Sequence, residues 1–430
     1  MKTDQIQKVH KDWYKLDLSA IVYPTLQRRD FSSVYRLSVL LKEDIDPEIL
    51  QRAVNLTMPR FPTYKAAIRK GVFWRYLEPN DRPGPFVQED VKNPCQPMHF
   101  KGNNRYLVRI YYYRNRIALE AHHSLGDGTG GMCVLQTLTA TYLRLKGHSE
   151  IENGGFVLDI LGIPDPGELE DAYMKYANAK VCPPRPGEKT YRVRGTKEPF
   201  YTLNIIDGIM SVSEVMRVAK SYNATITEYL NSVLLYALMQ KQESEWHWKL
   251  RPVKIAMPVN LRRFFPSRTL RNFITMIYPG IDPRLGEYTF EEIVTQVHNY
   301  MRYYLNEKLL RGDITTNAET QRNPFIRIVP LFIKDLVVRQ FYTKIQDKNS
   351  SAGLTNMGAL KVPETMKPYI ERFDIYMGQP FSTRTNCAIA SFEDILTINF
   401  ASSIAETDVE RLFFRKLVQD GIHVKIESNR

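Results

Sequence analysis

The chain has 430 residues, which is more than one ordinary hydrophobic core holds, so two domains are expected. Hydrophobic residues make up 43% of the chain and charged residues 25%, proportions that exclude a disordered protein. The net charge of +12 comes from basic residues spread along the chain and not from one basic block. This pattern argues against nucleic acid as a partner and favours a phosphorylated cofactor.

The cysteines and the apolar segments indicate the compartment. Cys95, Cys133, Cys182 and Cys387 are widely spaced and form no CxxC pair, so neither a zinc motif nor a disulfide framework is expected. The first residues lack the apolar core of a signal peptide, and no apolar run approaches the ~18 residues that span a bilayer. We therefore expect a cytoplasmic protein without a membrane span.

The first half of the chain mixes the two types of secondary structure. Segments with alternating apolar residues predict strands, and apolar stripes at helical spacing predict helices. The elements predicted there are, in chain order, a strand at 32–41, a helix that Asp46 caps, a hairpin of strands at 105–113 and 116–123, and a helix through Leu135 and Leu145.

Residues 146–200 are rich in proline, glycine and charge, which favours a segment between two domains. The second half mixes strands and helices again, and three Thr–Glu pairs at capping-box spacing predict helix starts. The elements predicted there are a helix at 212–222, a helix capped by Thr225 and Glu228, a strand at 253–261, a helix capped by Thr289 and Glu292, strands at 385–392 and 395–402, and a last helix capped by Thr407 and Glu410. The sequence therefore predicts an α/β protein with mixed sheets, one domain at 1–180 and another at 181–430.

The segment HHSLGDGTGG (122–131) joins a predicted strand to a predicted helix. Gly126, Gly128 and Gly131 match the G-x-G-x-x-G pattern of dinucleotide-binding folds, in which backbone N–H groups hold a pyrophosphate. This interpretation leaves the two histidines without a role and puts the carboxylate of Asp127 beside the phosphates. It also requires a second strand that ends in an acid about 20 residues further on, and no strand pattern lies there.

A catalytic base is the competing interpretation. Alternation sends the side chains of His122 and His123 to opposite faces of the strand, so only one of them can face a cleft. A neutral imidazole accepts a proton at physiological pH, and Asp127 can pair with a distant cation and fix the loop. The glycines would permit tight turns and the close approach of a substrate. The alternative is that both histidines end the strand with satisfied hydrogen bonds and take no part in catalysis.

A metal site is not expected at this loop. Two adjacent histidines on a strand point away from each other and cannot both reach one ion. Neither His99 nor Cys133 stands at a spacing that would complete a zinc ligand set.

The segment HHSLGDG resembles the HHxxxDG signature of the CoA-dependent acyltransferase superfamily. This superfamily includes chloramphenicol acetyltransferase, the condensation domains of peptide synthetases, alcohol acetyltransferases and polyketide-associated acyltransferases. MPVNLRR followed by RNF resembles a stretch of the family's second half, and GLTNMGAL resembles its later strand. DIYMG, from Asp374 to Gly378, stands where plant members carry DFGWG and keeps only the outer residues of that motif.

The resemblance implies two similar chloramphenicol acetyltransferase-like domains that meet at a cleft or tunnel. It gives the role of general base to His123. The family's motif aspartate is structural and pairs with an arginine from elsewhere in the chain. The residues expected to support the site are His122, Asp127, Gly128 and Arg262, with Arg263 as the second candidate for the arginine.

The activity that the resemblance implies is transfer of an acyl group from acyl-CoA to a small-molecule hydroxyl or amine acceptor, without a metal. We expect direct attack and no acyl-enzyme, since no cysteine or serine stands in a nucleophile motif. Asn356 or Ser382 is expected to donate a hydrogen bond to the oxyanion or the substrate. Two alternatives remain. The acyl donor can be an acidic acyl carrier protein, which the positive charge would suit, or the chain can be a non-catalytic binding protein on the same scaffold.

Overall fold

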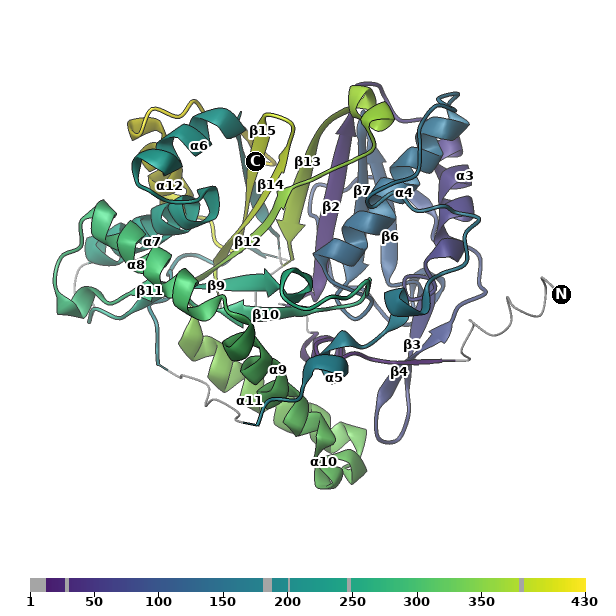
Figure 1. Ribbon diagram of the computed structural model, residues 1–430, viewed down its shortest axis with the longest axis horizontal. Coiled ribbons are helices and arrows are strands. Elements are labelled where there is room, and N and C mark those ends of the chain that lie inside the picture. The colour runs from purple at the N-terminus through teal and green to yellow at the C-terminus, as the bar shows by residue number, and fades with distance from the viewer. Residues whose placement is uncertain (1–12, 28–30, 181–187, 200–201, 246–248, 379–382) are drawn as a thin grey trace.

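The computed structural model describes residues 13–430 except 28–30, 181–187, 200–201, 246–248 and 379–382. Two lobes lie side by side, and each is a β-sheet packed against helices (Figure 1). The predicted boundary between residues 180 and 181 falls at the edge of a segment that lies outside the described residues. Every helix in the described ranges is too short or too polar to cross a bilayer.

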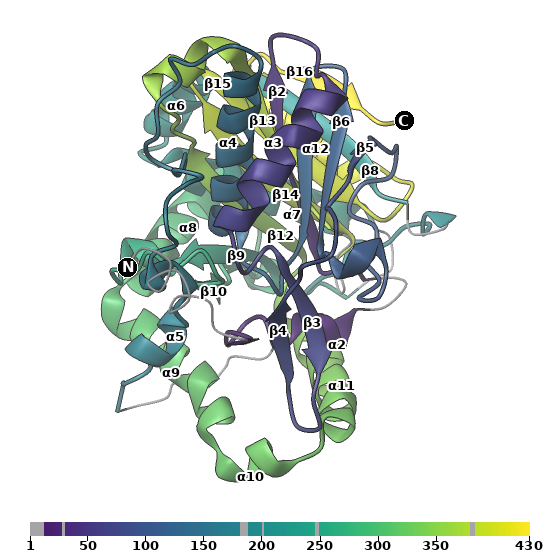
Figure 2. The same cartoon turned by 90° about the vertical axis from the view of Figure 1, so that its right-hand side faces the viewer.

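The first lobe is built on a five-stranded sheet with the order β13-β2-β7-β6-β5. Its neighbouring strands are antiparallel except for β5 and β6, which are parallel. The helices α3 and α4 cover one face of this sheet (Figure 2). The bounds of these elements are β2 Val34–Leu41, α3 Pro47–Thr57, β5 Val87–Glu89, β6 Val108–Tyr113, β7 Arg116–His122, α4 Gly128–Leu145 and β13 Ile370–Met377.

The strand β13 comes from the second half of the chain but belongs to the first lobe's sheet. It pairs with β2 from Ile370 to Met377. On its other side, Thr397 donates a hydrogen bond to the Phe373 carbonyl at 2.8 Å and the Ile375 N–H donates to Asn399 at 3.0 Å. Residues 370–377 thus join the first lobe, although the expected division placed them with residues 181–430. Alternation along a strand shows which face is buried but not which sheet edge the strand joins.

The second lobe is built on an eight-stranded sheet with the order β10-β9-β12-β14-β15-β8-β16, with β11 also paired to β9. The helices α7, α8 and α12 pack together against this lobe's apolar core. The bounds are β8 Asn204–Ser211, α6 Val212–Ser221, α7 Ile226–Ser244, β9 Val253–Asn260, β10 Ile274–Ile277, β11 Gly280–Ile281, α8 Phe290–Tyr304, β12 Ala352–Ala359, β14 Thr385–Phe392, β15 Ile395–Ser402, α12 Asp408–Gln419 and β16 Lys425–Ser428.

The lower part of the molecule in Figure 1 holds a small three-stranded sheet, of order β1-β4-β3, and a group of helices. Within the predicted interdomain segment, α5 packs on α9 in a separate apolar cluster around Phe265 and Phe273. The bounds are β1 Tyr14–Lys15, α2 Tyr23–Leu26, β3 Ala66–Lys70, β4 Arg75–Pro79, α5 Ala172–Tyr176, α9 Glu307–Arg322, α10 Pro324–Ile328 and α11 Leu331–Asn349.

Two of the three predicted capping boxes form. Thr225 and Glu228 begin α7, and Thr289 and Glu292 begin α8, with side chain and backbone hydrogen-bonded in both directions. The third prediction was wrong, because the Thr407 side chain makes no cap hydrogen bond at the start of α12. Glu410 instead turns into the protein, where it accepts a hydrogen bond from the Thr385 hydroxyl at 2.6 Å. Burial raises the pKa of Glu410.

The difference between Thr289, which caps α8, and Thr407, which does not cap α12, can be tested by mutation. Thr289→Ala removes one acceptor from the first turn of α8 and is expected to lower the free energy of unfolding by about 1 kcal/mol. Thr407→Ala removes no cap and is expected to change it by less than about 0.5 kcal/mol. Urea unfolding of the two variants measures both values, and equal losses would contradict the assignment of the caps.

Candidate functional site

The segment 122–131 joins β7 to α4, as the sequence predicted. Its two histidines bond to different neighbouring strands through their backbones. The His122 N–H donates to the Leu107 carbonyl at 3.0 Å, and the His123 N–H donates to the Ser33 carbonyl at 2.8 Å. Successive residues of an extended chain place their side chains on opposite faces, so the two imidazoles have different surroundings.

His122 is fully buried in the first lobe. Its Nδ1 accepts a hydrogen bond from the Ser124 N–H at 3.2 Å, and its ring meets Phe100 edge-to-face with the centroids 5.4 Å apart. Burial, together with the neighbouring His123, lowers the pKa of His122 to about 3. His122 is therefore a neutral, packed side chain at pH 7.

His123 is partly exposed and lies between two tyrosine rings. Tyr23 stacks on it at 4.8 Å between centroids and 21° between planes, and Tyr35 lies at 4.6 Å with a tilt of 49°. Burial lowers the pKa of His123 to about 4, while the charge of Asp127, the Asn272 side chain and a backbone hydrogen bond to Gly126 oppose the shift. The imidazole is thus neutral and held in place at physiological pH.

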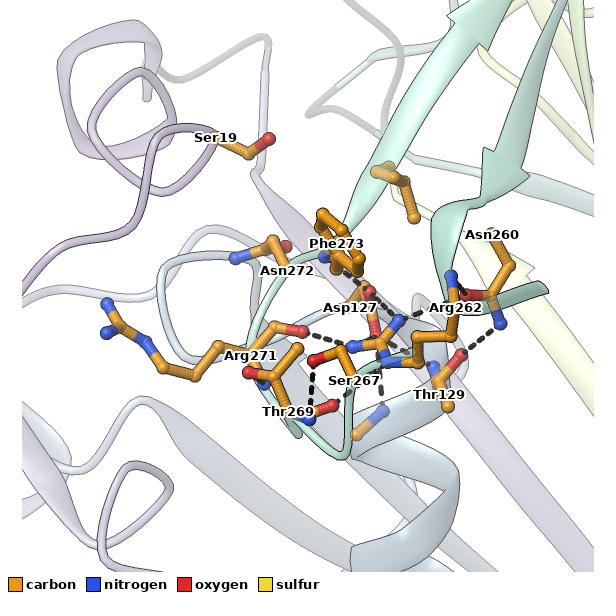
Figure 3. A network of polar contacts seen from close by, with 12 residues as sticks. Ser19, Asp127, Thr129, Asn260, Arg262, Ser267, Thr269, Arg271, Asn272 and Phe273 are labelled. Atoms are coloured by element: carbon orange, nitrogen blue, oxygen red, sulfur yellow. Dashed lines mark hydrogen bonds and ion pairs between the residues drawn. The ribbon is translucent and has the colours of Figure 1, made fainter. Parts of the chain in front are cut away.

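Asp127 forms the predicted ion pair with Arg262. Its Oδ2 accepts from the Arg262 Nη1 at 2.8 Å, and its Oδ1 accepts from Nη2 at 3.3 Å. The same carboxylate caps α4 by accepting from the N–H groups of Thr129 and Gly130, and it accepts from the Phe273 N–H at 2.9 Å (Figure 3). Among the described residues, none of its hydrogen bonds comes from His123.

The N-cap bonds of Asp127 also decide against the phosphate interpretation. The N–H groups of Thr129 and Gly130 at the start of α4 already donate to this carboxylate. A phosphate at the same helix end would meet a negative charge and find these donors taken. The G-x-G-x-x-G match was therefore incidental.

Arg262 lies in a 3₁₀ turn, Leu261–Arg263, directly after β9. Besides Asp127, its guanidinium donates to the carbonyls of Thr269 at 2.9 Å and Arg271 at 2.5 Å and to the Asn260 side chain at 3.3 Å. These bonds hold residues 269–273 around the carboxylate (Figure 3). Arg263, the second candidate, is exposed and belongs to the same turn but not to this ion pair.

Three polar residues near His123 were missed at the sequence level. The Asn272 amide donates to the His123 carbonyl at 2.9 Å and to the buried Asp17 carboxylate at 3.0 Å. Asp17 faces the Arg271 Nε at 3.7 Å, and burial raises its pKa while Arg271 opposes the shift. Arg271 and Asn272 belong to the RNF stretch noted in the sequence, which was the available signal. Nothing in the sequence connects Asp17 to it.

The glycines of the loop serve a different purpose from the one expected. None of them adopts a positive φ, so they do not provide left-handed turns. A Cβ on Gly126 would lie 2.4 Å from the Leu270 carbonyl oxygen, and one on Gly130 would lie 1.9 Å from it. The missing side chains of Gly126 and Gly130 make room for Leu270 of the 269–273 segment. Gly128, the first residue of α4, faces the flexible side chain of Met357.

Of the two residues expected to contact the oxyanion, the structure describes Asn356 but not Ser382. Asn356 lies in β12, where its amide donates to the Thr227 hydroxyl at 2.9 Å and accepts from the Gly358 N–H at 2.7 Å. Both bonds lie within the second lobe, and no hydrogen bond joins Asn356 to His123. Ser382 lies outside the described residues.

The DIYMG segment supports the loop from the side of β13. Asp374 is buried and accepts a hydrogen bond from the Arg372 Nε at 3.2 Å. A Cβ on Gly378 would lie 2.0 Å from the Val34 carbonyl oxygen, at the end of β2 that adjoins Ser33. The two outer residues that this segment shares with the plant motif therefore have structural reasons to be there.

Three of the four cysteines lie among the described residues. Cys95, Cys133 and Cys387 are buried single thiols, and burial raises the pKa of each, for Cys133 to about 12. A thiol with a raised pKa is a poor nucleophile. Cys182 lies outside the described residues. In the described ranges, His, Cys, Asp and Glu side chains form no group of three or more that would hold a metal ion.

Solved structures match the chain over nearly its whole length. A starter condensation domain of rhizomide synthetase, in complex with C8-CoA and Leu-SNAC, has 10% identity and a TM-score of 0.60 over 98% of this chain and 96% of that one. Trichothecene 15-O-acetyltransferase from Fusarium sporotrichioides has 12% identity and a TM-score of 0.58 over 95% and 94%. The chain has the fold of these transferases.

Polyketide synthase associated protein 5 from Mycobacterium tuberculosis is similar in the same way, with 14% identity and a TM-score of 0.59 over 94% of this chain and 96% of that one. No protein-family profile and no curated protein sequence matches the chain. The two-lobed α/β fold implied by the sequence resemblance is thus confirmed, whereas identities of 10 to 14% carry no substrate with them.

The ion pair between the lobes gives a first prediction for the site. Asp127→Ala leaves the nearly buried guanidinium of Arg262 without its carboxylate and is expected to lower the free energy of unfolding by about 3–5 kcal/mol. Asp127→Asn keeps an oxygen that caps α4 and should lose less. The control Arg268→Ala breaks the exposed pair with Asp165 and should cost less than about 1 kcal/mol. An Asp127→Ala loss as small as the control's in urea unfolding would contradict this account.

The buried His122 gives a prediction about pH. Its pKa lies below that of a histidine in the unfolded chain, so between about pH 6.5 and pH 3 the unfolded state binds the extra proton. Acid therefore lowers stability across that window. His122→Asn should reduce the slope of unfolding free energy against pH by up to about 1.4 kcal/mol per pH unit. Urea unfolding of the wild type and of His122→Asn at several pH values measures the slope, and equal slopes for the two proteins would contradict this account.

Proposed function

We propose that this protein is a CoA-dependent acyltransferase of the HHxxxDG superfamily, and that His123 is its general base. The observation that carries the proposal is the state of His123, a neutral and partly exposed imidazole fixed between Tyr23 and Tyr35. A base has to be unprotonated, positioned and accessible, and this side chain combines the three. The neighbouring His122 is neutral but buried, so it lacks access.

The chemistry follows from the requirements of acyl transfer. An acceptor hydroxyl or amine loses its proton as it attacks the thioester carbonyl, and His123 takes that proton. The imidazolium that forms is stabilised by the nearby charge of Asp127. This charge acts against the lowering of the His123 pKa by burial. When the tetrahedral intermediate collapses, the proton passes to the leaving thiolate. The acyl group moves directly to the acceptor, in keeping with three described thiols whose pKa values are raised.

The oxyanion of the intermediate requires a hydrogen-bond donor. Asn356 remains a candidate, because its amide has two hydrogens and the contact with Thr227 uses one of them. Ser382 remains a candidate from the sequence alone. The site in this proposal lies where residues 269–273 of the second lobe meet the loop that carries His123.

Acyl-CoA is the proposed donor. The structurally similar rhizomide synthetase domain was solved with C8-CoA, and a chain with a net charge of +12 suits a cofactor that carries phosphates. The second candidate donor is an acyl group on an acidic carrier protein. Several of the similar structures are synthetase condensation domains, and the net charge of +12 would also suit an acidic protein.

The proposal predicts that His123→Ala lowers the rate of acyl transfer about 10²–10⁴-fold, the usual contribution of a general base. The measurement is release of free CoA from a series of acyl-CoA donors with simple alcohol and amine acceptors, together with thermal unfolding to verify the fold. His122→Ala is the matched control, because it deletes the adjacent imidazole and is expected to lower stability more than the rate.

Three results would each contradict a part of the proposal. Activity of His123→Ala within about tenfold of wild type would remove His123 from the role of base. Wild-type protein that transfers no acyl group from CoA but does so from an acylated carrier protein would favour the second donor. A wild type that binds acyl-CoA and turns over neither donor would favour a non-catalytic binding protein.

A further inference from the structure

Large apolar side chains are exposed at the lower end of the molecule, where the β3–β4 hairpin, α10 and α11 lie (Figures 1 and 2). They lie on three segments: the tip of the β3–β4 hairpin at residues 72–74, the helix α10, and residues 331–340 of α11. We call these three segments the apolar platform. Phe325 and Phe332 are 76% and 73% exposed, and Val72, Trp74, Ile328 and Leu336 are exposed as well. Soluble proteins seldom leave so many large apolar side chains together in water.

The three segments of the platform are joined to one another by hydrogen bonds. The Leu331 N–H donates to the Val72 carbonyl at 2.9 Å. The ammonium group of Lys334 donates to the carbonyls of Phe73 at 3.0 Å and Arg327 at 3.1 Å, so it ties the hairpin tip to α10. These bonds hold the three segments next to one another.

The charges around the platform are predominantly positive. Residues 70–75 and 323–340 contain five basic residues and a single acidic one, Asp335. That carboxylate is bound by the guanidinium of Arg75 at 2.8 and 2.5 Å, so its charge is balanced locally. Lys70, Arg327 and Arg339 are exposed. The platform thus combines apolar side chains with a positive rim.

We propose that the apolar platform docks the protein on an anionic lipid surface. Interfacial segments bind in this way, with Trp, Phe and Leu entering the acyl boundary while Lys and Arg meet anionic headgroups. A second copy of the chain is the less favoured occupant, since it would bring two positive rims together. Trp74 at the hairpin tip fits the headgroup level, where its ring is apolar and its N–H meets a polar partner.

The platform is also joined to the surroundings of His123. The Thr25 hydroxyl in α2 donates to Asp335 of α11 at 2.8 Å, and Arg339 donates to the Thr25 carbonyl at 2.9 Å. The same short helix carries Tyr23, which stacks on His123. Docking would place the lipid surface against the element that positions the proposed base. The docking itself does not depend on acyl transfer, so it can be tested independently of the proposed function.

The test is co-sedimentation of the full-length protein with vesicles of phosphatidylcholine alone and of phosphatidylcholine with phosphatidylserine. The wild type is expected to bind the anionic vesicles more tightly and to lose affinity as salt is added. Phe325→Ser combined with Phe332→Ser should weaken binding to the anionic vesicles about tenfold or more. Thermal unfolding and CoA release with water-soluble substrates, expected at wild-type values, verify that this variant is folded.

The matched control removes apolar surface elsewhere. Leu161 and Leu285 are 88% and 81% exposed and lie outside the platform, and Leu161→Ser combined with Leu285→Ser should bind vesicles like the wild type. Wild-type protein that binds neither kind of vesicle would overturn the proposal, and so would an equal loss of binding in the two double variants. A dimer in sedimentation velocity that dissociates in the Phe325→Ser and Phe332→Ser variant would also overturn it and assign the platform to self-association.

Discussion

The buried charge of Asp127 is the constraint on which the arrangement of this site depends. A carboxylate removed from water has to be compensated, and here five donors from three places in the chain converge on it. Two are backbone N–H groups of α4, one is the Phe273 N–H, and two belong to Arg262. Because α4 belongs to the first lobe and Arg262 to the second, satisfying this one charge fixes how the lobes meet beside His123.

The two histidines show how a strand separates roles between neighbouring residues. Alternation puts His122 into the core of the first lobe and His123 at the junction, although one peptide bond joins them. Burial lowers the pKa of both, so neither carries a charge that would have to be compensated near Asp127. The aromatic rings of Tyr23 and Tyr35 then hold the His123 imidazole without using its nitrogens for the purpose.

Much of this arrangement could be predicted from the sequence, and what could not has physical reasons. The strand, loop and helix around HHSLGDG follow from local periodicity, and Arg262 followed from the need of a buried aspartate for a cation. The role of Asp17 could not be predicted, because its contact with Asn272 links residues 255 positions apart that share no pattern. The capping residues of α12 were misjudged because Glu410 has a stronger use, as the acceptor for Thr385 in the core. The glycines were recognised as necessary, but only the fold shows that Leu270 is what approaches them.

The position of β13 has a consequence for how the chain can be made. The ribosome releases β2 long before residues 370–377, which complete its pairing. At about 5–20 residues/s, the synthesis of the intervening segment takes roughly 15 to 65 s. Throughout that time one edge of β2 has free N–H and C=O groups, and an open edge pairs readily with other chains. The first lobe therefore cannot finish folding in the order in which it is translated, and the nascent polypeptide has to protect this edge until residues 370–377 emerge.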